Sequence, residues 1–200
     1  SLGFEFAEKS LLITFHPVTL EPEESIKQMT ALLDVLSELH DVQLIFTAPN
    51  ADVGGRAISD VINAFVAEND KAHLRISLGQ LVYLSCMQFV DGVVGNSSSG
   101  LLEAPTLGVG TVDIGNRQKG RLAASSVINC APTKENIRAA IEALYAPDYQ
   151  NALANIDNPY GKGGACKKIV DTLASMNFEN LKTKTFYDYP GHADSHGGRQ

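Results

Sequence analysis

The stretch Val93-Val-Gly-Asn-Ser-Ser-Ser-Gly-Leu-Leu-Glu103 decides the fold class. A short apolar run, typical of a buried strand, passes directly into a serine-rich turn, and the turn opens a helix. Parallel strands need a crossover connection of this kind, because each strand must return to the same end of the sheet. The stretch therefore predicts one βα unit of an α/β domain.

The same pattern recurs along the chain. Strands are predicted at residues 11–15, 42–46, 73–77, 92–95, 111–114 and 127–130, and helices at 26–36, 58–66, 81–89, 96–103, 134–145 and 165–176. This alternation predicts a doubly wound, mainly parallel, Rossmann-like sheet with helices on both faces. We expect residues 1–180 to form this domain and residues 181–200 to form an extension and mobile tail.

Polar residues follow four of the predicted strands. His16, Asn50, the run Asn96–Ser98 and Arg117 each come just after an apolar run. Ligands of open α/β sheets bind outside the carboxyl ends of the strands, where the strand order reverses. The sequence therefore predicts that these loops meet at one edge and form a ligand site.

The serine-rich turn is a candidate phosphate cradle. Amide groups at a helix start lack partners within the helix, and the hydroxyls of Ser97 and Ser98 lie beside them. Gly100 keeps a side chain out of the first turn, and Glu103 follows where its carboxylate can accept hydrogen bonds from a ribose. A purely structural interpretation is that Ser97 or Ser98 simply caps the helix.

The remaining candidates fit structural roles as well. Arg117 can bind a diphosphate through two hydrogen bonds, but with Lys119 and Arg121 it also fits a solvated basic loop. His16 fits a phosphate ligand or a proton donor to a leaving group, or else a structural histidine. Asn50 fits a ligand contact or a turn residue, and Tyr83 fits a base contact or a core position.

Composition limits the possible partners. A net charge of −7 argues against a nucleic-acid partner, and no apolar run is long enough to span a bilayer. The beginning of the chain shows no signal-peptide pattern, and the three cysteines form no CxxC pair, so we expect a cytoplasmic protein with neither a metal nor another cofactor.

Six segments together resemble the hydrolysing UDP-N-acetylglucosamine 2-epimerases of sialic-acid synthesis. In chain order they are Thr14-Phe-His-Pro-Val-Thr-Leu-Glu21, Pro49-Asn-Ala-Asp-Val-Gly-Gly55, Ser77-Leu-Gly-Gln80, Gly95-Asn-Ser-Ser-Ser-Gly-Leu-Leu-Glu-Ala104, Asn116-Arg-Gln-Lys-Gly-Arg121 and Asn158-Pro-Tyr-Gly-Lys-Gly163. The resemblance reaches to about residue 176.

The resemblance implies the C-terminal domain of a GT-B enzyme, with a UDP-sugar bound between this domain and an N-terminal one. It places His16, Asn50, Ser97, Ser98, Glu103 and Arg117 on nucleotide-binding positions, with Leu78 and Tyr83 near the uracil. Ser97, Ser98 and Arg117 would hold the diphosphate, and Glu103 the ribose. His16 is the catalytic candidate within this chain.

The family reaction removes a proton from the sugar carbon that bears the acetamido group, eliminates UDP and hydrates the product to N-acetylmannosamine. The carboxylates that act as base and acid would belong to the N-terminal domain, so we expect this chain alone to bind UDP weakly and to turn nothing over. We further expect a homodimer of the full-length protein. The sugar remains open between N-acetylglucosamine and a 4-acetamido-6-deoxy relative.

Two departures from the family pattern stand out. Gly110 stands where the family often has proline, and Asp113, where asparagine is common, adds negative charge near the site.

Three alternative functions fit parts of the sequence. The first is a non-hydrolysing epimerase, which would carry Gly-His-Arg-x-Glu-Asn in place of the segment from Thr14 to Thr19. A GT-B glycosyltransferase and a non-catalytic module that senses nucleotides are the second and third of these functions.

Overall fold

In a computed structural model that describes residues 2–18, 22–50 and 54–178, six parallel strands form one sheet. The strands are β1 (Ser10–Thr14), β2 (Gln43–Thr47), β3 (Ala72–Arg75), β4 (Gly92–Gly95), β5 (Gly110–Ile114) and β6 (Val127–Cys130). Their order across the sheet is β3-β2-β1-β4-β5-β6. Each strand lies within two residues of a range that the apolar runs predict, and the predicted doubly wound sheet is confirmed.

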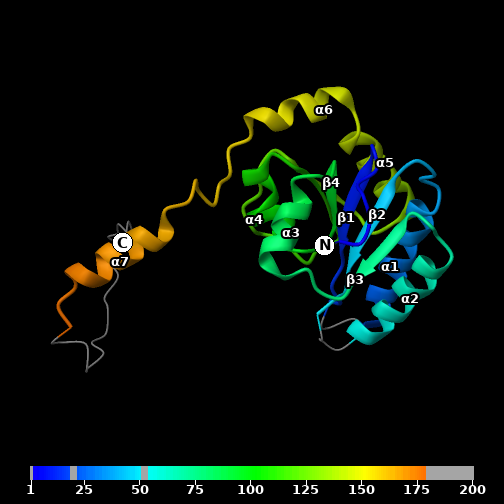
Figure 1. The fold of residues 1–200 in the computed structure, drawn as a ribbon, viewed down its shortest axis with the longest axis horizontal. Coiled ribbons are helices and arrows are strands. Elements are labelled where there is room, and N and C mark those ends of the chain that lie inside the picture. The colour runs from blue at the N-terminus through cyan, green and yellow to red at the C-terminus, as the bar shows by residue number, and fades with distance from the viewer. Residues whose placement is uncertain (1, 19–21, 51–53, 179–200) are drawn as a thin grey trace, which may run out of the picture. The chain divides into compact units, whose positions relative to one another are not determined.

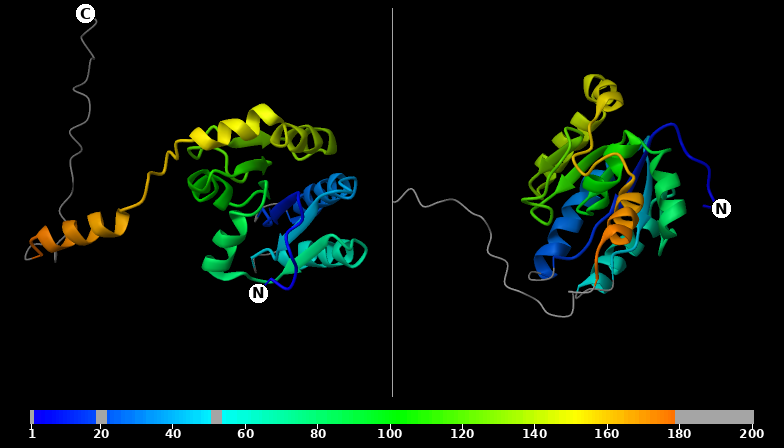
Figure 2. Two further views of the ribbon diagram at one scale, coloured as in Figure 1. Left: turned by 45° about the horizontal axis from the view of Figure 1, so that its top comes forward. Right: turned by 90° about the vertical axis from the view of Figure 1, so that its left-hand side faces the viewer.

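Helices cover both faces of this sheet (Figure 1). The helical elements are α1 (Pro22–Leu36), α2 (Gly55–Ala67), α3 (Gly79–Met87), α4 (Ser99–Leu102), η1 (Ala104–Leu107), α5 (Lys134–Leu144), α6 (Pro147–Ala152), η2 (Leu153–Asn155) and α7 (Ala165–Ser175). Helices α1, α2 and α5 share one hydrophobic core with the sheet, and α3 and η1 share a second core on the other face. Figure 2 shows the same layers from two further directions.

Alternate residues of the central strands enter these two cores. On β1, Leu11 and Ile13 pack toward α1 and α2, whereas Leu12 packs toward α3. Because successive side chains of a strand point to opposite faces, a strand that is covered on both sides is mostly apolar along its length. This is why the middle of β1, from Leu11 to Ile13, is a continuous apolar run, with the buried polar residues Ser10 and Thr14 at its two ends.

The strand order reverses between β1 and β4. The chain runs outward from β1 through β2 to β3, and then crosses back to place β4 on the other side of β1. The loops that leave β1 and β4 therefore turn away in opposite directions and open a crevice between them. We call the carboxyl ends of β1, β4 and β5, with the first residues after each, the rim.

Helix α4 is much shorter than the serine-rich turn suggests. The sequence predicts a helix from Asn96 to Glu103, but α4 is a single turn that gives way to the 3-10 turn η1. Pro105 explains the break, because its ring would clash with the carbonyl four residues earlier and it has no N–H to donate. Gly108 then ends η1 with φ at 69°.

The chain separates into two compact units, Ser1–Lys162 and Gly163–Gln200. The first unit holds the sheet and the rim. In the second unit the structure describes residues up to 178, including α7, whose apolar side chains Ile169, Val170 and Leu173 are exposed. The extension and tail expected at 181–200 lie outside the described residues. Among the described residues no helix has the length and apolar character needed to cross a bilayer.

Candidate functional site

The centre of the rim is a close approach between the ends of β1 and β4. Thr14 pairs with Gly95, and the amide of Asn96 donates a hydrogen bond of 3.2 Å to the carbonyl of Thr14. Gly95 has φ at 141°, and a Cβ on it would lie 2.1 Å from the Thr14 carbonyl oxygen. Only glycine allows the two strand ends to come this close.

The side chain of Asn96 joins the loops that follow these two strands. Its Oδ1 accepts a hydrogen bond of 2.7 Å from the amide of His16, and its Nδ2 donates one of 2.8 Å to the carbonyl of His16. Asn96 is only 1% exposed. The two bonds fix the His16 backbone against β4, although the two residues are 80 positions apart in sequence.

The loop after β5 contacts the same residue. Arg117 Nη1 lies 3.1 Å and Gln118 Nε2 lies 2.7 Å from the carbonyl oxygen of Asn96, and both nitrogens donate to it. Gln118 is buried, whereas Arg117 is exposed. A buried amide thus anchors the loop, while the guanidinium beside it stays accessible to an anion.

Asn50 reaches the rim through His16. The backbone amide of Asn50 donates a hydrogen bond of 3.2 Å to His16 Nδ1. A neutral imidazole that accepts at Nδ1 carries its hydrogen on Nε2, so this bond selects one tautomer. A Cβ on Gly55 would lie 2.3 Å from the carbonyl oxygen of Asn50, so only glycine at position 55 allows these two residues to come this close.

The serines occupy the turn directly after Asn96. Ser97 Oγ accepts a hydrogen bond of 3.3 Å from the amide of Ser99, whereas Ser98, the N-cap residue of α4, makes no capping bond through its side chain. Ser98 precedes the single turn of α4, and both serines are half-buried. A helix this short supplies little dipole, so any phosphate binding there depends on the hydroxyls and local amides.

Tyr83 and Leu78 line a hollow beside the rim. The hollow has a volume of about 280 Å³, and its other walls are Thr47, Ala48, Ile76, Ser77, Gly79 and Gln80. Tyr83 Oη lies 3.4 Å from Thr14 Oγ1, which is itself 2.8 Å from Thr47 Oγ1. The tyrosine therefore connects this hollow with the end of β1.

Glu103 contributes a carboxylate with an unused acceptor. Its Oε2 is buried and has no hydrogen-bond partner in the part of the chain that the structure describes. A buried polar atom without a partner is costly, and such atoms often face a ligand that completes the site. Glu103 is also close enough to Tyr83 for its charge to contribute to the raised pKa of that phenol, which burial chiefly causes and nearby Ser99 and Thr14 oppose.

Asp113 is the buried acid of the rim. It lies on β5, is 3% exposed and pairs in register with Gly95. Burial raises its pKa to about 6, and the positive charge of Arg117 acts in the opposite direction. The negative charge expected near the site is therefore present, but it is suppressed as the pH falls below neutrality.

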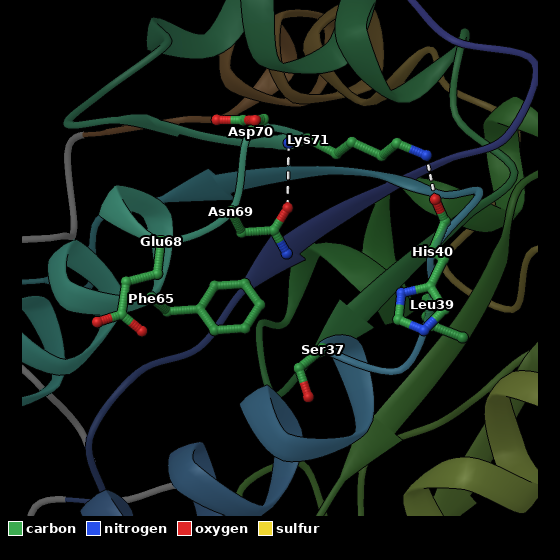
Figure 3. A pocket seen from close by; sticks show the side chains of 8 residues that line it. All are labelled: Ser37, Leu39, His40, Phe65, Glu68, Asn69, Asp70 and Lys71. Atoms are coloured by element: carbon green, nitrogen blue, oxygen red, sulfur yellow. Dashed lines mark hydrogen bonds between the residues drawn. The ribbon is translucent and has the colours of Figure 1, made fainter.

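A second hollow, of about 430 Å³, lies at the opposite edge of the sheet (Figure 3). Its walls come from the ends of α1 and α2 and from the segments that enter β2 and β3, including Ser37, His40, Phe65 and Lys71. Lys71 Nζ donates to the carbonyl of His40 across it. None of the eight site residues expected from the sequence lines this hollow.

All eight expected residues lie around the carboxyl edge of the sheet. Hydrogen bonds connect His16 with Asn50, and Asn96 connects His16 with Arg117; Ser97 and Ser98 follow Asn96 directly. Leu78 and Tyr83 share one hollow. Within the described residues, no group of three or more His, Cys, Asp or Glu side chains could hold a metal ion.

Two residues that organise this edge are not evident from the sequence. Asn96 is recognisable as a polar residue after a strand, but no nearby sequence pattern predicts its two hydrogen bonds to the His16 backbone. Gln118 sits inside an apparently basic loop and gives no sign of being 3% exposed. Both depend on contacts between distant segments, and spacing alone does not reveal such contacts.

The strand order and the polar rim define a Rossmann-type α/β domain with its candidate ligand site at the switch point. Comparison with known proteins gives the family. The chain belongs to the UDP-N-acetylglucosamine 2-epimerase family, whose model matches residues 4–174. This confirms the resemblance found in the six sequence segments.

Two relatives illustrate the similarity. The chain is 35% identical over 190 residues to the GDP/UDP-N,N'-diacetylbacillosamine 2-epimerase (hydrolyzing) of Campylobacter jejuni, covering 94% of this chain and 49% of that protein. It is 34% identical over 187 residues to polysialic acid biosynthesis protein P7 of Escherichia coli, covering 92% and 47%. The chain therefore spans about half the length of these relatives.

Solved structures share the fold. The UDP-GlcNAc 2-epimerase of Neisseria meningitidis bound to UDP-GlcNAc matches with a TM-score of 0.69 and 25% identity, over 83% of this chain and 44% of that one. The glycosyltransferase WaaG matches with a TM-score of 0.54 and 14% identity, over 84% and 48%, and its likeness concerns the fold alone. GT-B epimerases and glycosyltransferases thus share this architecture.

Proposed function

We propose that this chain is the UDP-binding half of a hydrolysing UDP-N-acetylglucosamine 2-epimerase, corresponding to the C-terminal domain. The whole protein would convert UDP-N-acetylglucosamine and water to N-acetylmannosamine and UDP. Family membership and the relatives whose names include "hydrolyzing" support the reaction class. The observation that carries the proposal is that Asn96 holds both His16 and Arg117 at the switch point.

Each group has a role in this proposal. Arg117 and the hydroxyls of Ser97 and Ser98 bind the diphosphate, and they stabilise the negative charge that develops on the departing UDP. His16 donates from Nε2 to a diphosphate oxygen, because its Nδ1 already accepts from Asn50. The base that removes the sugar proton lies in the other domain of the whole protein.

The nucleoside would extend from the diphosphate toward β2 and β3. Glu103, which is half-buried, then accepts from the ribose hydroxyls, and the uracil enters the hollow lined by Leu78 and Tyr83. Adjacent strands are about 4.8 Å apart, so the distance from β5 across β4 and β1 to β2 is about 14 Å. A nucleoside diphosphate has comparable length.

Titration of this chain with UDP, followed by calorimetry, tests the proposal. Arg117→Ala and Ser98→Ala should each weaken binding by about 1–3 kcal/mol, because each removes a contact to a charged group. Arg121→Ala is the matched control, because Arg121 is an exposed arginine of the same loop. Binding that is absent from the native chain, or equal in all variants, contradicts the site.

A further inference from the structure

We propose that Asn96 and Gln118 are positioning residues that hold His16 and Arg117 in one rigid arrangement, so that both address the same diphosphate. This inference rests on the proposed function. Neither residue is expected to touch the ligand, but the affinity for the diphosphate depends on their hydrogen bonds to the rim backbone.

The orientation of the Asn96 amide is fixed by its partners. The amide nitrogen of His16 can only donate, and the carbonyl of His16 can only accept, so Oδ1 must face the first and Nδ2 the second. The two bonds hold the peptide groups on both sides of the His16 Cα. Because they constrain the backbone at two points, they fix the position of the His16 Cα and the direction in which its side chain leaves the backbone.

The carbonyl of Asn96 constrains the other half of the rim. It accepts from Arg117 Nη1 and from Gln118 Nε2, which accounts for both of its lone pairs. Gln118 Oε1 is buried and has no hydrogen-bond partner among the described residues, so this amide is held through its nitrogen, by the bond to Asn96. The loop after β5 is thus pinned beside the loop after β1 through a single residue.

This arrangement matters for binding because a diphosphate needs donors on both sides at hydrogen-bond distance. Displacement of a charged donor by about 1 Å weakens such a contact strongly. His16 and Arg117 come from loops that follow β1 and β5, and β4 lies between these two strands. Asn96, at the end of β4, therefore supplies a connection between them.

The fold offers a matched control in Gln43. Its Oε1 accepts from the amide of Ala7 at 3.2 Å, and its Nε2 donates to the carbonyl of Glu5 at 3.0 Å. Like Asn96, Gln43 is a buried amide that holds a distant backbone at two points. It lies at the amino end of β2, however, and so at the opposite edge of the sheet from the rim.

The experiment compares three variants of this chain with the native one. Asn96→Ala removes the two hydrogen bonds to the His16 backbone. Gln118→Met removes the hydrogen bond to the Asn96 carbonyl with little change in side-chain volume. Gln43→Ala removes the hydrogen bonds of the control residue to Ala7 and Glu5. UDP affinity is measured by calorimetry and stability by thermal unfolding. The ring nitrogens of His16 are followed by NMR in the histidine-labelled chain, with His16→Ala used to assign them.

We expect Asn96→Ala and Gln118→Met each to weaken UDP binding about tenfold, because the donors of His16 and Arg117 are then no longer held in position for the diphosphate. In Asn96→Ala the His16 nitrogens should lose the pattern of a single Nε2–H tautomer, because the contact with Asn50 needs a fixed His16 backbone. Gln43→Ala should lower stability to a similar extent while leaving both the affinity and the His16 signals unchanged.

The remaining outcomes separate the two proposals. If the native chain binds UDP and both rim variants bind it equally well, the positioning role is overturned and the proposed function stands. If Gln43→Ala weakens binding as much as Asn96→Ala, the effect is a general loss of stability and the positioning role is again wrong. If the native chain binds no UDP, the proposed function itself fails. Should Asn96→Ala not fold, Gln118→Met decides the question.

Discussion

Thr111 Oγ1 donates a hydrogen bond of 2.9 Å to the carbonyl oxygen of Gly100, and Thr111 Cγ2 lies 2.4 Å from where a Cβ on Gly100 would be. The contact packs α4 directly against β5. The sequence suggests that Gly100 leaves space for a phosphate, and the structure gives it a second role in the packing of helix against strand. The contact with β5 therefore also holds the turn that contains Ser97 and Ser98, which directly precedes α4.

Gly100→Ala should therefore destabilise the domain. The added methyl group overlaps Thr111 in a site where both residues are buried, and overpacking of this kind costs about 1–3 kcal/mol of unfolding free energy. Urea unfolding measures the loss. Thr111→Ser removes the overlapping methyl group and keeps the hydroxyl, so the double variant should recover most of the stability. A double variant no better than Gly100→Ala would contradict this explanation.

Asp113→Asn should make the stability of the domain less dependent on pH. The folded pKa of Asp113, about 6, lies above the ordinary value of 3.8. Between these values the folded state holds a proton that the unfolded state releases, so the unfolding free energy of the native protein falls as the pH rises through this window. Above it, the whole penalty of the buried charge is present.

The variant lacks this penalty and should be more stable than the native protein at pH 8, by on the order of 2 kcal/mol. At pH 4, where Asp113 is largely protonated in the folded state, the two should be nearly equal. Urea unfolding at pH 4, 6 and 8 measures the difference. A variant that is less stable at pH 8 than the native protein would show that the Asp113 charge is well compensated.

Much of this fold follows from local patterns, because strands that are buried on both faces are mostly apolar. The runs around Leu11, Leu44 and Val93 give the strands, and the helical spacing of Ile58 and Ile62 gives one of the helices between them. The end of α4 is less evident, because it depends on how Pro105 interrupts a pattern that otherwise continues to Glu103.

The site is predictable as a set of loops but not as a set of contacts. Residues that follow strands of a parallel sheet meet at one edge, so His16, Asn50 and Arg117 could be placed together from the sequence. The bond between Asn96 and the His16 backbone requires Gly95 to bring β4 against β1, and this depends on three-dimensional packing. The ligand roles of these residues remain predictions.

Tyr83→Phe and Tyr83→Ala should separate the role of the ring from that of the hydroxyl. The hydroxyl lies 3.4 Å from Thr14 Oγ1, a long contact, and Thr14 keeps its bond to Thr47 when the hydroxyl is removed. The side chain of Ser99 also interacts with this hydroxyl, so Tyr83→Phe should lower the unfolding free energy by about 0.5–1.5 kcal/mol, the usual net contribution of a hydrogen bond. Tyr83→Ala should weaken UDP binding about tenfold, because the uracil loses its contact with the aromatic ring.

Inorganic pyrophosphate is the matched ligand for this comparison. It has no base, so its affinity, measured by the same calorimetry, should be the same for the native chain and Tyr83→Ala. If the alanine variant loses pyrophosphate binding to the same degree as UDP binding, Tyr83 supports the diphosphate site through Thr14 and does not bind the uracil.

Glu103→Met should raise the stability of the domain and weaken its binding of UDP. The buried Oε2 of Glu103 has no hydrogen-bond partner among the described residues, so replacing the carboxylate with an apolar side chain of similar length should raise the unfolding free energy by about 1 kcal/mol. The same change removes the acceptor for the ribose and should weaken UDP binding about tenfold. Opposite signs for the two effects distinguish a ligand-binding acid from a structural one.

A UDP analogue without the 2′ and 3′ hydroxyls tests the contact itself. The native chain should bind UDP more tightly than this analogue, because only UDP can donate to Glu103. In Glu103→Met the two ligands should bind equally, since the acceptor is gone from the protein. A methionine variant that retains the native preference for UDP would show that another group recognises the ribose, and the buried oxygen would then need a different explanation.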